Sequence, residues 1–295
     1  MTSNNAQIFR PFLLVPMGLL LAGVGCTENE IRAQPIRDIA LVAGDFDNMA
    51  ENLDRLLVTY QVYEGFICCA SYDTEIDPET NVLKEETLFV GTDDSVGDIF
   101  QYDAVFLNSG ARGWGEYEYN GVNEDNGLVS DPLALENIER FVDRGGLLFI
   151  SDWTYDLVEA IWPDKVKFFG QDEGTHDAAQ SGRIGKVQAT VVDDAVAQGL
   201  EIDEVTLDYN YSNWTVMEEV GDGVDVILRG DVEYRLSSSD GYGTAQNVPL
   251  LISMEIGAGQ LVYSNFHWNA QTPNLADRLM VAVAPGLTAI ASVGD

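Results

Sequence analysis

Polar and aromatic residues directly follow two of the most apolar runs in this 295-residue sequence, and their types suit binding or hydrolytic chemistry. After "GLLFI" come Ser151, Asp152 and Trp153, and after "LVYSNF" come His267, Trp268 and Asn269. An aspartate can form a covalent intermediate, and a histidine can act as its general base. Structural roles are equally open: Asp152 can cap a following helix, His267 can bond a backbone carbonyl, and the tryptophans can belong to the core.

Two further apolar runs, "IALVA" and "AVFL", are also followed by polar residues. Ligands of open α/β sheets bind beyond the carboxyl ends of the parallel strands, where loops from several strands meet. We therefore expect one ligand site formed by residues that follow all four runs. Its expected members are Asp45, Asn108, Arg112, Trp114, Ser151, Asp152, Trp153, His267, Trp268 and Asn269.

The elements that must position these residues alternate between buried strands and amphipathic helices. Continuous apolar runs predict parallel strands buried on both faces, at 37–45, 102–108 and 146–152. Apolar residues at helical spacing predict helices at 49–60, 130–145 and 154–162. The first helix is expected to bury a stripe of Met49, Leu53, Leu56, Leu57 and Tyr60.

This alternation predicts an open, mostly parallel α/β sheet in one domain. From about residue 186 the pattern changes to short strands separated by turns, which predicts a mixed or antiparallel C-terminal extension. A helix at 274–284 is expected to close the fold.

The order of these elements, with "FVDRGG" before the third strand and "FH" after a late one, resembles the class I glutamine amidotransferase-like superfamily, including its ThuA-like branch. The resemblance covers roughly residues 37–285 and implies a flavodoxin-like sheet with helices on both faces. Active members carry a cysteine at the elbow after a central strand. They also carry a histidine in an FHPE-like motif, in which a glutamate stands two residues after the histidine. By this resemblance His267 matches the histidine, and Asp152 stands at the elbow.

The sequence departs from the family pattern at the residues that perform the chemistry. Asp152 cannot supply the thiolate that attacks an amide carbonyl. Trp268 replaces the proline, and Asn269, in place of the glutamate, has no charge to stabilise an imidazolium. We therefore interpret the chain as a degenerate member without amidotransferase activity.

Residues 1–26 are predicted to be a lipoprotein signal peptide. "PFLLVPMGLLLAGVG" has signal-peptide length, is too short for a comfortable membrane span, and ends in small residues before Cys26. It resembles a bacterial lipoprotein signal, in which the cysteine is acylated, although Gly23 stands where that family prefers leucine. The alternative is an ordinary cleaved signal and a secreted product. We expect export and a lipid anchor in the cell envelope, a tether at 27–36 and one α/β domain at 37–290.

Composition and cysteine usage exclude several other functions. The chain has 49 acidic residues against 15 Lys and Arg, a formal net charge of −34, and this charge opposes binding to nucleic acid. Cys68 and Cys69 are adjacent and lack further ligands at a recognisable spacing, so we predict free thiols and no metal site. No cofactor motif is present, and we predict no cofactor.

Three functions remain open at this point. The first is a non-catalytic lipoprotein that binds a small molecule, a carbohydrate or another envelope component. The second is a hydrolase that uses Asp152 and His267. The third is a structural or partner-binding surface lipoprotein without a pocket.

Overall fold

The computed structural model describes residues 36–44, 46–65, 83–91, 96–110, 127–170, 179–212, 214–236 and 241–288. The predictions made for several residues lie outside this part of the chain. They concern the signal peptide, the tether up to residue 35, Cys26, Asp45, Cys68, Cys69, Arg112 and Trp114. The chain divides into two compact units, Met1–Arg32 and Ala33–Asp295, and all described residues belong to the second. No helix among them is long and apolar enough to cross a membrane.

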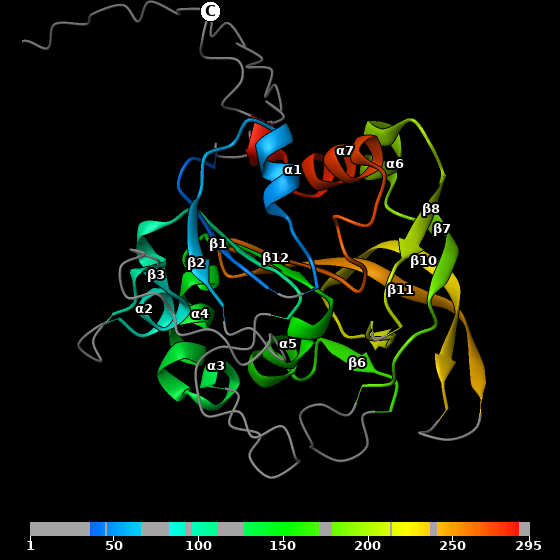
Figure 1. Ribbon diagram of the computed structural model, residues 1–295, viewed down its shortest axis with the longest axis horizontal. Helices are drawn as coiled ribbons and strands as arrows, with labels where there is room; N and C mark the ends of the chain where they lie inside the picture. Colours follow the sequence, from blue (N-terminus) through cyan, green and yellow to red (C-terminus); the bar gives the residue numbers. More distant parts are fainter. Residues whose placement is uncertain are drawn as a thin grey trace, which may run out of the picture. The chain divides into compact units, whose positions relative to one another are not determined.

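A ten-stranded sheet forms the centre of the second unit (Figure 1). Its parallel strands are β1 (Ile39–Val42), β2 (Gln61–Glu64), β3 (Leu83–Lys84), β4 (Ala104–Leu107), β5 (Leu147–Ser151) and β12 (Gly259–Ser264). Its antiparallel strands are β7 (Gly185–Val191), β8 (Glu204–Tyr209), β10 (Val224–Arg235) and β11 (Tyr242–Ile256). The strand order is β3-β2-β1-β4-β5-β12-β11-β10-β7-β8.

This topology confirms the predicted fold class, a flavodoxin-like and mostly parallel sheet with an antiparallel extension on its C-terminal side. The core order β2-β1-β4-β5-β12 is the 2-1-3-4-5 order of flavodoxin-like folds. The chain runs from β1 outward to β2 and then returns to β4 on the other side of β1. The order of strands therefore reverses between β1 and β4, and such a point leaves a crevice at the carboxyl ends of the two strands.

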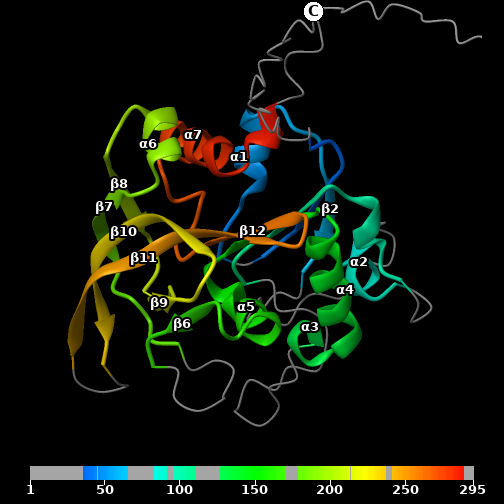
Figure 2. The ribbon, with the colours of Figure 1, turned by 180° about the vertical axis from the view of Figure 1, so that it is seen from behind.

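Helices cover both faces of the sheet (Figures 1 and 2). One face carries α1 (Ala50–Arg55), α6 (Asp194–Leu200) and α7 (Pro273–Val283). The other carries α2 (Glu85–Phe89), α3 (Gly127–Ser130), α4 (Pro132–Asp143), α5 (Tyr155–Ile161) and the two-stranded sheet of β6 (Val166–Phe168) and β9 (Met217–Val220). Three short 3₁₀ helices are η1 (Asp98–Gln101), η2 (Asp152–Thr154) and η3 (Pro285–Thr288).

Alternate residues of the central strands β1 and β4 enter two separate cores. In β1, Leu41 packs with the α1 and α7 side, and Val42 packs with the α4 and α5 side. Because β1 and β4 are buried on both faces, they are apolar along their whole length, which explains their uninterrupted hydrophobic runs in the sequence.

The first helix is shorter than its apolar pattern predicts. A Schellman motif ends α1, with the Leu57 N–H bonded to the Asp54 carbonyl and the Val58 N–H bonded to the Leu53 carbonyl. Leu57 has a φ of +56° and is 81% exposed, so its expected place on the buried stripe is wrong. The left-handed residue turns the chain back toward β2, and Val58 occupies the buried position instead.

Candidate functional site

The turn after β5 is a sharp elbow between a buried strand and a helix. Asp152 follows Ser151 directly and has a φ of +45°, in the left-handed region that a residue with a side chain rarely adopts. A strained strand–turn–helix junction of this kind holds the nucleophile in many α/β enzymes. Aspartate tolerates this conformation better than most residues, and the surrounding bonds hold it there.

The carboxylate of Asp152 is completely enclosed, with 0% of the residue exposed. Its Oδ1 accepts from the Thr215 backbone N–H at 2.8 Å and from the Thr215 hydroxyl at 3.3 Å. Its Oδ2 lies 2.8 Å from Nε2 of His267 and accepts from the Ser109 hydroxyl at 3.4 Å. The backbone carbonyl of Asp152 accepts from the Tyr263 hydroxyl at 3.0 Å. Both carboxylate oxygens are therefore in use within the fold.

His267 joins this elbow to the surface. Its other ring nitrogen, Nδ1, lies 2.9 Å from Oδ1 of Asn210, an exposed residue just after β8. Its ring also contacts the ring of Tyr211 edge-on, with 5.4 Å between the centroids. With an oxygen acceptor at each nitrogen, the imidazole is placed to donate two hydrogen bonds, which is the pattern of the protonated ring.

Burial and the neighbouring charges perturb both titrations. Burial raises the pKa of Asp152, while the hydrogen bond and charge of His267 and the bonds from Thr215 oppose the rise. Burial alone would lower the pKa of His267, but the hydrogen bond and charge of Asp152, with the charge of Asp47, outweigh it and raise the pKa above 6.5. Because the carboxylate accepts four hydrogen bonds, we place the shared proton on the imidazole.

Protonation of His267 should make the stability of the domain depend on pH. A raised folded-state pKa means that the stabilisation is complete below pH 6.5 and is lost as the pH rises through the folded pKa. We expect the free energy of unfolding of the natural protein to fall over this window, and His267→Gln to flatten the profile there. Urea denaturation at a series of pH values measures the effect.

Glu159 provides the control for this titration. Burial and the charge of Asp156 raise the pKa of Glu159 to about 8, so its charged form also disfavours folding as the pH rises from 4.5 to about 8. Glu159→Gln should reduce the slope of the stability profile from pH 4.5 to about 8 and leave the contribution of His267 above pH 6.5 in place, whereas His267→Gln should act only above pH 6.5. Identical profiles for the natural protein and His267→Gln would contradict the protonated pair.

The structure brings together some of the predicted site residues and separates others. The turns at Ser151–Trp153 and His267–Asn269 lie side by side, joined by the Asp152–His267 contact. The Ser151 hydroxyl accepts the Ser109 N–H at 2.9 Å and is buried. That these residues bind a ligand stays a prediction.

The structure decides between the structural roles that the sequence left open at the elbow. Asp152 does not cap the following helix, because neither η2 nor α5 has a side-chain cap and the carboxylate bonds Thr215, Ser109 and His267 instead. Trp153 and Trp268 pack against the two opposite cores. Trp268 is fully buried between Phe149 and Phe266, and its ring N–H donates to the Ser264 hydroxyl.

Sequence reasoning missed three residues that complete the elbow. They are Asn210, Thr215 and Tyr263. Asn210, and not Asn269, bonds the second ring nitrogen of His267, and Asn269 is exposed. The strand-end rule would have found Asn210, had it been applied to the antiparallel strand β8 as well as to the parallel strands.

Asp47 ties the first turn of the fold to the last one. Its carboxylate accepts three backbone N–H groups, from Asn48 at 2.8 Å, Trp268 at 3.0 Å and Asn269 at 3.1 Å. The His267 turn is therefore held against the loop between β1 and α1. This contact defines one side of the crevice between β1 and β4.

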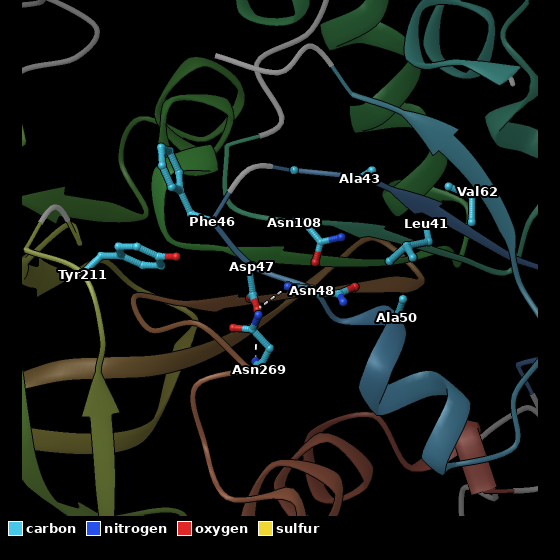
Figure 3. Close-up of a pocket in the computed structure, with 11 residues that line it drawn as sticks. Leu41, Ala43, Phe46, Asp47, Asn48, Ala50, Val62, Asn108, Tyr211 and Asn269 are labelled. Carbon is cyan, nitrogen blue, oxygen red and sulfur yellow. Dashed lines mark hydrogen bonds between the residues drawn. The ribbon is translucent and has the colours of Figure 1, made fainter. Parts of the chain in front are cut away.

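An open pocket of about 340 Å³ lies in that crevice (Figure 3). Its lining comes from β1, β2, the loop into α1 with the first residue of that helix, and the residues after β4, β8 and β12. The lining residues are Leu41, Ala43, Gly44, Phe46, Asp47, Asn48, Ala50, Val62, Asn108, Tyr211 and Asn269. Among the predicted site residues, Asn108 and Asn269 line it. Gly44 lies so close to the backbone after β4 that a Cβ would be 2.4 Å from the Ser109 carbonyl oxygen.

Some polar side chains of the pocket are hydrogen-bonded within the fold, and others are exposed and can bond a ligand. The Asn108 amide donates to the Val42 carbonyl at 3.0 Å and accepts the Met49 N–H at 2.8 Å, so it holds the loop in place. Asn48 and Asn269 are exposed at the rim. Within the described ranges, no three His, Cys, Asp or Glu side chains gather as metal ligands.

Comparison with known proteins gives no family for this chain. No family model matches the sequence, and no curated protein matches it. Solved structures resemble it over most of its length at low identity. A protein described as a GMP synthase subunit, from Thermoplasma acidophilum, has 10% identity and a TM-score of 0.48, covering 87% of this chain and 96% of that one.

Two other solved structures are similar to the same degree. A ThuA-like protein from Bacteroides uniformis has 9% identity and a TM-score of 0.49, covering 86% of this chain and 92% of that one. A cytoplasmic protein from Salmonella typhimurium has 13% identity and a TM-score of 0.49, covering 84% and 98%. Similarity of this size assigns no activity to this chain.

Proposed function

We propose that this protein is an exported lipoprotein of the bacterial cell envelope whose α/β domain binds a small molecule and does not catalyse an amidotransferase reaction. The observation that carries the proposal is the open pocket between β1 and β4, beside an elbow whose carboxylate is enclosed. A crevice at the reversal of strand order is the usual ligand site of this fold class. A metabolite, a carbohydrate or another envelope component fits the size of such a pocket.

The contacts of Asp152 argue against a role as nucleophile. Attack on a substrate needs a carboxylate oxygen with a free approach, and both oxygens of Asp152 accept bonds inside the fold. His267 cannot accept a proton from water through Nε2 while that nitrogen bonds Asp152. The enclosed pair therefore serves the fold.

The hydrolase alternative has one observation in its favour. Asp152 has the positive φ of a nucleophile elbow. Asp152 bonds His267 and His267 bonds Asn210, which is the arrangement of nucleophile, base and orienting residue in a catalytic triad. The burial of the carboxylate opposes it. The third alternative, a structural or partner-binding surface lipoprotein without a pocket, is disfavoured by the open pocket between β1 and β4.

The binding proposal is tested by filling the pocket from a position that tolerates the change. Val62 lines the pocket and is 40% exposed, so Val62→Phe should fold normally and reduce the space for a ligand. A compound found by ligand-detected NMR in a set of sugars, amines and small amides should bind the natural protein and bind Val62→Phe at least roughly tenfold more weakly, or about 1.4 kcal/mol.

Val192→Phe is the matched control, because Val192 has a similar exposure of 42% and does not line the pocket. Its affinity for the same compound should equal that of the natural protein. Equal binding by Val62→Phe and Val192→Phe would place the ligand elsewhere and refute this pocket as the site.

A further inference from the structure

We infer that the pocket between β1 and β4 selects ligands that carry a positively charged ammonium group. This inference rests on the proposed binding function and names the chemical class of its ligand. It is drawn from the charge inside the pocket, the aromatic rings at its side, and the amide groups at its rim.

Asp47 carries the only formal charge among the described residues that line the pocket. Its partners are three backbone N–H groups, which are dipoles that stabilise a carboxylate without neutralising it. No ion pair in the described part of the chain includes Asp47. Among the described residues, therefore, no cation of the protein lies opposite this negative charge in the pocket.

The neighbouring elbow does not cancel this charge. Protonated His267 and ionised Asp152 form a pair whose charges sum to zero, at 2.8 Å between Nε2 and Oδ2. Adding Asp47 to that pair leaves one negative charge beside the pocket. A ligand with one positive charge balances it, and an anionic ligand adds to the imbalance.

Two aromatic rings at one end of the pocket favour the same charge. Phe46 and Tyr211 meet edge to face, with 5.9 Å between the ring centroids. Tyr211 is 46% exposed, and Figure 3 shows it on one side of Asp47 with Asn108 on the other. The negative faces of aromatic rings attract ammonium groups, most strongly where a carboxylate lies close.

The rim of the pocket supplies hydrogen-bond acceptors. Asn48 and Asn269 are exposed amides whose oxygens can accept N–H groups, and the part of the lining that the structure describes contains no Lys or Arg. The net charge of −34 further raises the local concentration of cations around the protein. A neutral sugar can use the amides, but it leaves the charge of Asp47 unbalanced.

Matched pairs of probes separate charge from shape. Choline and 3,3-dimethylbutan-1-ol have the same shape and differ in the charge of the central atom, and glucosamine and glucose differ by an ammonium in place of a hydroxyl. In titration calorimetry at low salt, we expect the charged member of each pair to bind at least roughly tenfold more tightly. Raising the ionic strength should weaken the charged members and leave the neutral ones unchanged.

Two exposed positions test the contributions of the ring and the charge separately. Tyr211→Leu keeps apolar volume and removes the aromatic face, so choline should bind roughly three- to thirtyfold more weakly, whereas Tyr211→Phe should retain binding. Asn269→Lys places a positive charge at the rim and should weaken choline binding roughly tenfold.

Gln246→Lys is the control for Asn269→Lys. It makes the same change in net charge at an exposed position of β11, before the residues of that strand that pair with β12. Choline affinity should be the same as in the natural protein.

The outcomes distinguish this inference from the proposed function. If the neutral member of each pair binds as tightly as the charged one, and Val62→Phe still weakens that binding, the pocket binds ligands but the ammonium inference is wrong. If Asn269→Lys and Gln246→Lys weaken choline equally, general charge attraction explains the binding, and the inference is also wrong. If no compound binds in a way that Val62→Phe changes, the proposed function fails, and the inference fails with it.

Discussion

Replacing Asp152 with alanine is expected to destabilise the domain by about 3–5 kcal/mol. The change removes a buried carboxylate and leaves the Thr215 N–H, the Ser109 hydroxyl and the ring of His267 without their acceptor. Unsatisfied buried donors each cost about 1–3 kcal/mol, and a buried ion pair is most costly when only one partner is removed. Chemical denaturation at neutral pH measures the loss.

Two variants separate the causes of this loss. Asp152→Asn tolerates the left-handed backbone and keeps an oxygen for Thr215, so it should lose less stability than Asp152→Ala. Glu201→Ala changes an exposed residue with a φ of +56° and no comparable buried bonds, and it should cost about 1 kcal/mol or less. If Asp152→Ala were no worse than Glu201→Ala, the enclosed network would contribute nothing to the fold.

Replacing Cys26 with serine is expected to move nearly all of the protein from the membrane fraction to the soluble fraction. Serine cannot receive the thioether-linked lipid, and the apolar run before residue 26 is shorter than a membrane span. Lipid burial contributes roughly 0.8 kcal/mol for each methylene, so an acylated anchor decides the partition. Fractionation of cells, with the mass of the mature chain, measures both the location and the modification.

Cys68→Ser is the matched control, because it makes the same chemical change at a cysteine outside the signal. It should leave the protein in the membrane fraction with its lipid. A Cys26→Ser protein that remained with the membrane would show that another feature holds it there, and the lipoprotein proposal would be wrong. Release of both variants would show that the release is not specific to Cys26, and it would contradict the expectation for the control.

Asp47 and Tyr211 connect the enclosed elbow to the open pocket. Asp47 joins the loop after β1 to the turn that carries His267, and Tyr211 contacts both His267 and Phe46. Because Tyr211 lines the pocket, only its ring would separate a ligand there from His267 and the Asp152 that His267 bonds. Changes at the elbow should reach the pocket through these contacts.

Much of the fold could be predicted because the strands are buried on both faces. Their continuous apolar runs, such as residues 39–42 and 104–107, need no partner to be recognised. The helix after Pro132 could be predicted equally well, since its apolar face repeats at helical spacing. That Asp131 caps its first turn is a finding of the structure. The end of α1 was not predictable in this way, because Leu57 is as apolar as the residues that are buried, and only the left-handed turn exposes it.

In the candidate site, too, some residues could be named from the sequence, whereas their contacts could not. Asp152 and His267 could be named because each follows a buried strand, and strand ends meet at one edge of a parallel sheet. Their hydrogen bond at 2.8 Å, and the bonds that Thr215 and Asn210 add, join residues far apart in the chain. The local sequence around each residue does not indicate such long-range contacts.

The sequence by itself determined the sheet, the types of residue at its carboxyl edge, the absence of a thiol at the elbow and the negative charge of the chain. Only the tertiary structure decided which of these groups face solvent. Asp152 and Trp268 are both enclosed, one by donors from three segments and the other by aromatic rings of the core, whereas Tyr211 and Asn269 line a pocket. The reason is that burial depends on what the rest of the chain packs against a side chain, and residue type and spacing describe only one partner of each contact.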